Sequence, residues 1–124
     1  MTQPLALVLY EKLLPGTQLV NRLQDLNYRV LTVPGAGALV ACAEQEKPLL
    51  VFTDLFSRDG KVPDAIAQLR QNPDTRHLPV IAFANERDTQ LQSAGRAAGA
   101  TLVVSDAAIL THLQHFLDQA LNLE

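Results

Sequence analysis

The chain has 124 residues, of which 48% are hydrophobic and 19% are charged, and its formal net charge is −3. This length predicts one domain over residues 1–124 with a single buried core, and the composition is typical of a globular protein. The negative charge argues against nucleic-acid binding, which usually requires a basic surface. A lone cysteine, Cys42, excludes an internal disulfide, and its small, apolar neighbours predict a buried side chain.

The sequence contains no apolar segment of membrane-spanning length. Its amino end also lacks a basic lead followed by a long apolar run, which a signal peptide would require. We therefore expect no membrane contact and a cytoplasmic location.

Five short apolar segments predict β-strands, because each is rich in strand-forming residues and is followed by turn-forming or polar ones. The first and third segments predict buried strands. These segments cover residues 5–10, 28–33, 49–53, 79–84 and 101–104. The third segment leads directly into Asp54, so a lone carboxylate follows what we expect to be the central strand.

A helical pattern follows each predicted strand. The helices are expected after Thr17, over residues 36–46, over residues 63–71, up to Gly99, and over residues 107–121. The expected capping residues are Thr17, Asn85 or Asp88, and Ser105 or Asp106. The first helix should bury an apolar face made by Leu19, Val20, Leu23 and Leu26.

Five strand–helix pairs with short connections predict a parallel sheet with helices on both faces. The strand order typical of this length is 2-1-3-4-5, which places the first and third strands side by side. Glu11 and Asp54 would then face each other at the edge where open α/β sheets carry their chemistry.

Three stretches match a known family in order and spacing. They are Val51-Phe52-Thr53-Asp54, residues 69–84 with their Leu-Arg pair and Leu-Pro-Val-Ile run, and residues 97–100. Over essentially its whole length the chain resembles the receiver domain of two-component response regulators. The resemblance implies a flavodoxin-like (CheY-like) three-layer αβα sandwich around a five-stranded parallel sheet of order 2-1-3-4-5.

The resemblance also implies a phosphorylation site. An aspartate after strand three accepts the phosphoryl group in this family, and Asp54 matches it. An acidic pair after strand one binds Mg²⁺ in the family, but Tyr10-Glu11 stands here. The resemblance therefore leaves Glu11 and Asp54 as a weak metal site at best, and we expect no cofactor beyond Mg²⁺ held there.

The remaining switch positions of the family are replaced. Ala84 stands where a hydroxyl residue belongs, Val103 replaces an aromatic residue, and Asp106 replaces a lysine. Phosphoryl transfer requires cations and hydrogen-bond donors around the oxygens. A carboxylate in place of the lysine would instead repel Asp54, by roughly 3 kcal/mol at about 5 Å and an effective dielectric constant of about 20. The chain is therefore expected to be a degenerate receiver, or pseudo-receiver.

Such a pseudo-receiver would serve two-component signalling as a phosphorylation-independent regulatory or protein-interaction module, and it would not be an enzyme. One alternative is a working single-domain response regulator, phosphorylated on Asp54 with Mg²⁺ held by Glu11. Another is a small ligand-binding flavodoxin-like domain that uses the crevice between Glu11, Pro15-Gly16 and Asp54.

Asp54 itself has three open interpretations: a phosphoacceptor, a metal ligand, or a residue that only ends a strand. Asp106 could join Glu11 and Asp54 in an acidic cluster that binds a hard cation. The simpler interpretation is that Asp106 faces solvent and caps the last helix.

The resemblance implies a protein partner, which would be a histidine kinase or another signalling protein. Receivers commonly bind partners or dimerise through the face from strand four to helix five. On or beside the fourth helix this chain carries Arg87, Gln90, Gln92 and Arg96. A polar surface of this kind suits a reversible contact, such as a homodimer, better than a permanent one.

Overall fold

Strands and helices alternate along the chain and build three layers. The computed structural model describes residues 3–121. The strands are β1 (Leu5–Leu9), β2 (Arg29–Val33), β3 (Leu50–Asp54), β4 (Val80–Ala84) and β5 (Leu102–Ser105). The helices are α1 (Leu13–Asp25), α2 (Leu39–Glu46), α3 (Val62–Gln71), α4 (Thr89–Ala98), α5 (Asp106–Thr111) and α6 (Leu113–Leu121), and a short 3₁₀ helix covers Ala36–Ala38.

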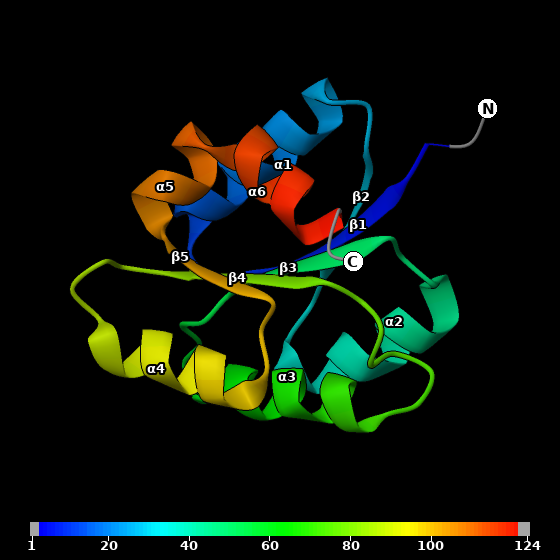
Figure 1. Cartoon of the computed structure of the whole chain (residues 1–124), viewed down its shortest axis with the longest axis vertical. Helices are drawn as coiled ribbons and strands as arrows, with labels where there is room; N and C mark the ends of the chain where they lie inside the picture. The colour runs from blue at the N-terminus through cyan, green and yellow to red at the C-terminus, as the bar shows by residue number, and fades with distance from the viewer. Residues whose placement is uncertain (1–2, 122–124) are drawn as a thin grey trace.

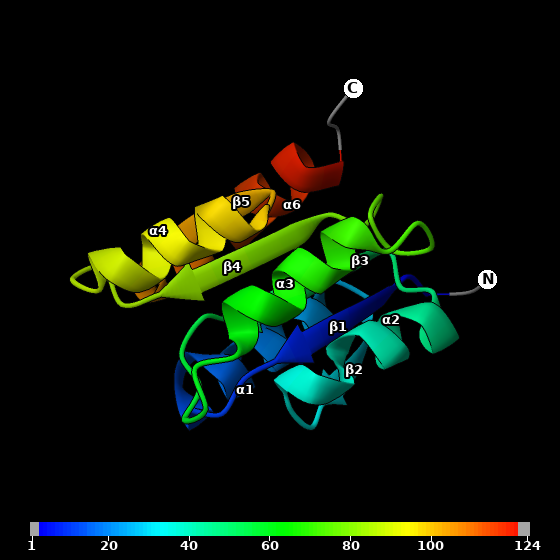
Figure 2. The same ribbon diagram turned by 90° about the horizontal axis from the view of Figure 1, so that it is seen from below.

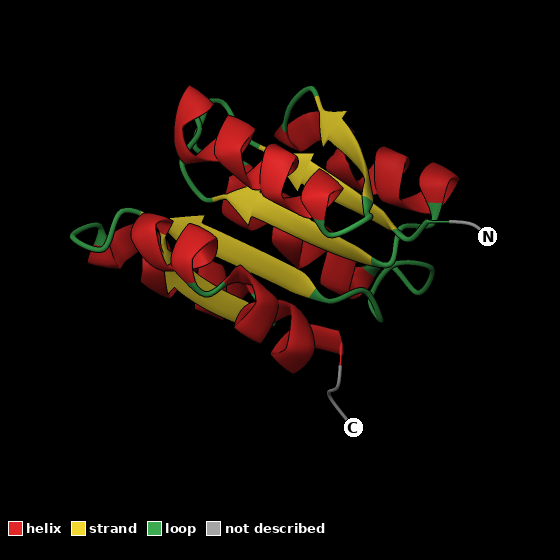
Figure 3. Ribbon diagram, turned by 90° about the horizontal axis from the view of Figure 1, so that it is seen from above, coloured by secondary structure: helices red, strands yellow, loops and turns green. Residues whose placement is uncertain are grey.

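All five strands belong to one parallel sheet in the order β2-β1-β3-β4-β5, which confirms the predicted topology. Helices α1, α5 and α6 cover one face of the sheet, and α2, α3 and α4 cover the other (Figure 1). The arrowheads of the strands point the same way, so their carboxyl ends gather along one edge (Figure 3). This edge is where the predicted site residues are placed.

The core consists of two apolar clusters, one on each face of the sheet. Alternate side chains of a strand point to opposite faces, so Phe52 packs with Leu19 of α1 while Val51 packs with Ile66 of α3. All four side chains are fully buried. Burying a side chain of this kind contributes roughly 1.5–3 kcal/mol. The strands β1, β3 and β4 are buried at every residue, because helices cover both of their faces. The edge strand β2 is mostly exposed and β5 is half-buried.

The first helix begins earlier than the sequence predicted. It starts at Leu13, and the Thr17 hydroxyl donates a hydrogen bond to the Leu13 carbonyl instead of capping the helix. Leu26, which was expected on the buried face, is 39% exposed because the helix has already ended before it.

The last helix was predicted as one piece and is two. The backbone leaves the helical conformation at His112, between α5 and α6. Two of the alternative caps are now assigned: Ser105 accepts the Ala108 N–H, and Asp88 accepts the Leu91 N–H.

Cys42 packs against the core but is only half-buried, so the prediction of a buried thiol was wrong in degree. No helix within residues 3–121 is both long and apolar enough to cross a bilayer.

Gly99 ends α4 in a conformation that suits only glycine. Its φ is +105°, and a Cβ there would lie 2.8 Å from Cγ of Arg70. We expect Gly99→Ala to lower the free energy of unfolding by about 1 kcal/mol, because the left-handed backbone conformation is unfavourable for alanine and its Cβ would displace the Arg70 side chain.

Denaturant unfolding of Gly99→Ala beside Gly37→Ala checks this prediction. A Cβ on Gly37 would meet no atom within 4 Å, so this control should keep the stability of the parent. Equal effects of the two substitutions would contradict the assignment.

Candidate functional site: the carboxyl edge of the sheet

Asp54 is the last residue of β3, so it lies at the carboxyl edge of the sheet. The strand β3 runs between β1 and β4 (Figure 2). Its register partner on β4 is Phe83. The side chain is 0% exposed. One carboxylate oxygen, Oδ1, accepts the Phe56 N–H at 3.0 Å, and this bond fixes the direction of the other oxygen.

The second oxygen of Asp54 faces a lysine. The Nζ of Lys12 lies 3.6 Å from Oδ2 of Asp54 and 3.6 Å from Oδ2 of Asp106. These are the only two ion pairs within residues 3–121. Lys12 is the N-cap residue of α1, and its Nζ also lies 5.5 Å from the centre of the Phe56 ring. A cation from the loop after β1 therefore bridges two acids that come from β3 and from the start of α5.

This ammonium group corrects the prediction that Asp106 leaves the crevice with uncompensated negative charge. Each Lys12–carboxylate attraction is roughly 5 kcal/mol at 3.6 Å and an effective dielectric constant of about 20, before desolvation. This exceeds the roughly 3 kcal/mol expected for repulsion between the two acids. Desolvation offsets much of the gain, so the cluster is held together but contributes little net stability.

Asp106 is partly buried, with 24% of its side chain exposed, and it pairs with Lys12. The side chain that caps α5 is that of Ser105. Oδ1 of Asp106 and Oδ2 of Asp54 are both buried without a hydrogen-bond partner among residues 3–121. Burial raises the pKa of the Asp54 carboxyl, and nearby Asp106 adds to this rise. The Phe56 N–H and the Lys12 ammonium lower the same pKa but do not outweigh burial.

Comparisons with solved structures give one consistent answer. A candidate response regulator from Chloroflexus aurantiacus J-10-fl superposes with a TM-score of 0.89 at 17% identity, covering 98% of this chain and all of that one. The receiver domain of the sensor histidine kinase PA1611 from Pseudomonas aeruginosa PAO1 matches at 0.87 and 19% identity, with 98% and 100% covered. A response regulator from Thermotoga maritima matches at 0.79 and 19% identity, with the same coverage. This chain has the receiver fold.

The sequence comparisons add nothing to this result. No family profile matches the sequence, and no curated protein matches it either. At identities of 13–19% the solved structures establish the receiver fold of this chain, and the roles of its residues have to be argued from its own geometry.

The PA1611 receiver domain was solved with a magnesium ion coordinated in its active-site cleft. The residues of this receiver fold do not fit the ion. The Glu11 carboxylate accepts the Arg58 N–H at 3.0 Å, and the ammonium of Lys12 stands beside Asp54. Within residues 3–121, no three His, Cys, Asp or Glu side chains are grouped to hold a metal.

Two other predicted switch positions, Ala84 and Val103, pack against the core. Ala84 ends β4 and is buried, and Val103 is half-buried on β5 beside Gly95 of α4. A methyl group and an isopropyl group can neither hydrogen-bond a phosphoryl oxygen nor swing between inward and outward positions as a larger side chain can. These two positions are packed as part of the core.

Tyr10 covers one side of the crevice that was predicted for a small ligand. Its ring lies so close to Gly16 that a Cβ on that glycine would overlap it. Pro15 and Gly16 are themselves buried. The Pro15-Gly16 side of the predicted crevice is therefore closed by the Tyr10 side chain.

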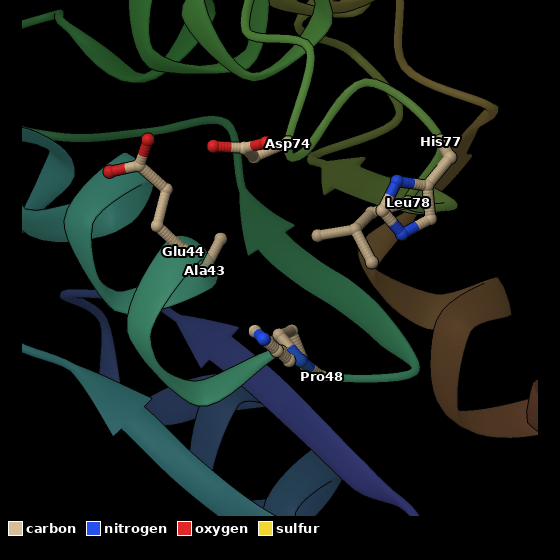
Figure 4. Close-up of a pocket in the computed structure, with 7 residues that line it drawn as sticks. Ala43, Glu44, Pro48, Asp74, His77 and Leu78 are labelled. Atoms are coloured by element: carbon tan, nitrogen blue, oxygen red, sulfur yellow. The ribbon is translucent and has the colours of Figure 1, made fainter.

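A pocket of about 370 Å³ lies at the opposite end of the sheet, by the amino ends of β3 and β4 (Figure 4). Glu44 comes from α2, and Asp74 and His77 come from the loop before β4. The Glu44 carboxylate accepts a hydrogen bond from Asn72. This pocket shares no residue with the cluster around Asp54.

Lys12 is the functional residue that the sequence reasoning missed. The predicted topology already brought residues 10–12 to the edge that carries Asp54, and the segment Tyr10-Glu11-Lys12 contains a cation next to the acid that was considered. A lysine was sought only after the fifth strand, where the family has it. A charge count over all the strand ends at this edge would have found it.

Proposed function

We propose that this chain is a receiver-fold module of two-component-type signalling that binds a protein partner without being phosphorylated, and that it catalyses no reaction. The observation that carries the proposal is the state of Asp54. Its carboxylate is 0% exposed and lies under the Lys12 ammonium at 3.6 Å.

Phosphorylation of an aspartate requires one of its oxygens to reach the phosphorus of a donor. The buried position of Asp54 opposes that approach, and its raised pKa means that burial disfavours the charged, nucleophilic form. Ala84 and Val103 then offer no hydroxyl group and no movable ring to report a phosphoryl group. Signalling through shape and surface does not depend on any of these groups.

The partner surface that we propose includes the exposed polar side chains on and beside α4, namely Arg87, Gln90 and Arg96. Guanidinium groups with free donors suit an acidic or carbonyl-rich protein surface. A histidine kinase, another signalling protein or a second copy of this chain would each present such groups.

A second candidate is a working receiver, and one observation favours it. Oδ2 of Asp54 is without a hydrogen-bond partner in the described chain and points toward a cation. If the side chains of Asp54 and Lys12 moved together so that Oδ2 of Asp54 reached a phosphoryl donor, the Lys12 ammonium could stabilise the negative charge of the phosphoryl group during transfer.

Incubation with acetyl phosphate and Mg²⁺, followed by intact-mass measurement, separates the two candidates. We expect the mass of the protein to stay unchanged, and the Asp54→Asn variant to give the same trace. A gain of one phosphoryl group that Asp54→Asn abolishes would establish the working receiver and overturn the proposal. An active receiver treated in parallel shows that the donor is competent.

A further inference from the structure

The Lys12 ammonium lies between two carboxylates. It lies 3.6 Å from an oxygen of Asp54 and 3.6 Å from an oxygen of Asp106. The Asp54 oxygen is on a side chain that is 0% exposed, and it has no hydrogen-bond partner in residues 3–121. A buried oxygen that accepts no hydrogen bond and faces only a positive charge is the arrangement expected for a cation ligand.

We propose that Lys12 is an internal, tethered cation that takes the place of a divalent metal ion, and that its removal converts the crevice into a divalent-cation site. This inference goes beyond the proposed function, because it concerns what neutralises the crevice and holds whether or not Asp54 is ever phosphorylated.

The local structure explains how the ammonium is kept in place. Lys12 follows β1 after a two-residue connection and directly precedes α1. Its side chain is 37% exposed, and its Nζ lies 5.5 Å from the centre of the Phe56 ring, whose face attracts a cation. The ammonium group therefore contacts an aromatic face as well as the two carboxylates.

The charge of the cluster shows why metal and lysine exclude each other. Two carboxylates and one ammonium leave one net negative charge, which is too little to compensate a divalent ion placed beside a like charge. Without Lys12 the two acids would carry two negative charges on hard oxygen atoms, each of which lies 3.6 Å from the present position of the lysine nitrogen. Mg²⁺ and Mn²⁺ prefer such oxygen ligands and complete their coordination with water.

Mn²⁺ titration by calorimetry and by thermal shift, at constant ionic strength, tests the proposal. The wild-type chain should show no specific binding, whereas Lys12→Ala should bind Mn²⁺ at least roughly tenfold more tightly and gain melting temperature with it. The double variant with Asp54→Asn should lose this gain, because the buried ligand oxygen is then neutral.

Lys61→Ala is the matched control, since Lys61 is exposed, lies in the loop next to the crevice and forms no ion pair in the described chain. It removes the same charge without touching Asp54. Lys12→Gln keeps the length of the side chain and serves if Lys12→Ala does not fold. The proposal is overturned if wild-type protein binds Mn²⁺ as tightly as the Lys12 variants, or if folded Lys12 variants bind no better than Lys61→Ala. Mn²⁺ binding is measured on unphosphorylated protein, so its outcome is independent of the acetyl phosphate experiment.

Discussion

Replacing Arg70 by methionine is expected to lower the free energy of unfolding by about 3 kcal/mol, or the melting temperature by roughly 12 °C in a chain of this length. The Arg70 guanidinium on α3 donates four hydrogen bonds. Its acceptors are the carbonyl oxygens of Gly99, Arg76 and Leu78 and the Thr101 hydroxyl, at 2.6–2.9 Å. One side chain thus ties α3 to the segments that lead into β4 and β5.

The expected loss of stability is large because the hydrogen-bond acceptors of Arg70 remain in the folded protein without their donor. Leu78 is buried and Gly99 is half-buried, so their carbonyl groups would be left without a donor in places that water reaches poorly. Lysine at this position cannot replace the planar group, since it has three donors on one atom. We expect Arg70→Lys to recover only part of the stability.

Urea unfolding of Arg70→Met beside Arg96→Met measures the effect. Arg96 is exposed on α4 and shows no side-chain hydrogen bond within the described residues, so this control should change stability by no more than about 0.5 kcal/mol. If both variants unfold at the same urea concentration, the four hydrogen bonds carry no net stability.

Asp54→Asn is expected to stabilise the protein at neutral pH. Burial raises the pKa of the Asp54 carboxyl, so its ionised form is less stable in the folded chain than in the unfolded one. The neutral amide removes this penalty, and the Lys12 ammonium keeps Asp106 as a partner. Asparagine keeps the shape of the side chain and an oxygen that can accept the Phe56 N–H.

The same pKa shift predicts how stability depends on pH. At a pH between the ordinary carboxyl value near 4 and the raised value, the folded chain holds a proton that the unfolded chain has released. The contribution of Asp54 is therefore fully present below the ordinary pKa and is lost as pH rises through the raised one. Asp54→Asn should remove this decline from the wild-type curve.

Melting temperatures across the acid and neutral range, for wild type, Asp54→Asn and Asp25→Asn, check both expectations. Asp25 is exposed at the end of α1, so its variant should keep the wild-type pH profile. A wild-type profile that Asp54→Asn leaves unchanged, or a loss of stability at neutral pH, would show that Lys12 compensates the buried charge fully.

The architecture could be inferred from the sequence pattern. Apolar runs such as residues 50–53, which are buried on both faces, alternate with helical patterns, and this alternation indicates a parallel sheet covered on two sides. The length of the chain then favoured the strand order that is observed. Asp54 could be placed at the carboxyl edge of the central strand for the same reason.

Helix ends were less predictable, because capping depends on which polar atom comes within reach. Thr17 looked like a cap and instead donates to a carbonyl inside α1, while the break at His112 leaves no mark in the apolar spacing of the last helix. In both places tertiary packing overrides the local pattern.

The chemistry at the edge of the sheet could be seen only in the folded chain. The replacement of a lysine by Asp106 predicted repulsion between the carboxylates of Asp106 and Asp54. The fold instead places the ammonium of Lys12, which is 42 residues before Asp54 in the sequence, between the two acids. Arg70 is a second long charged side chain whose partners the sequence pattern did not reveal, because its four hydrogen-bond acceptors come from residues 76–101. Periodicity reports which face of an element is buried, but the direction and reach of a long charged side chain are set by the groups that surround it, and these come from distant parts of the chain.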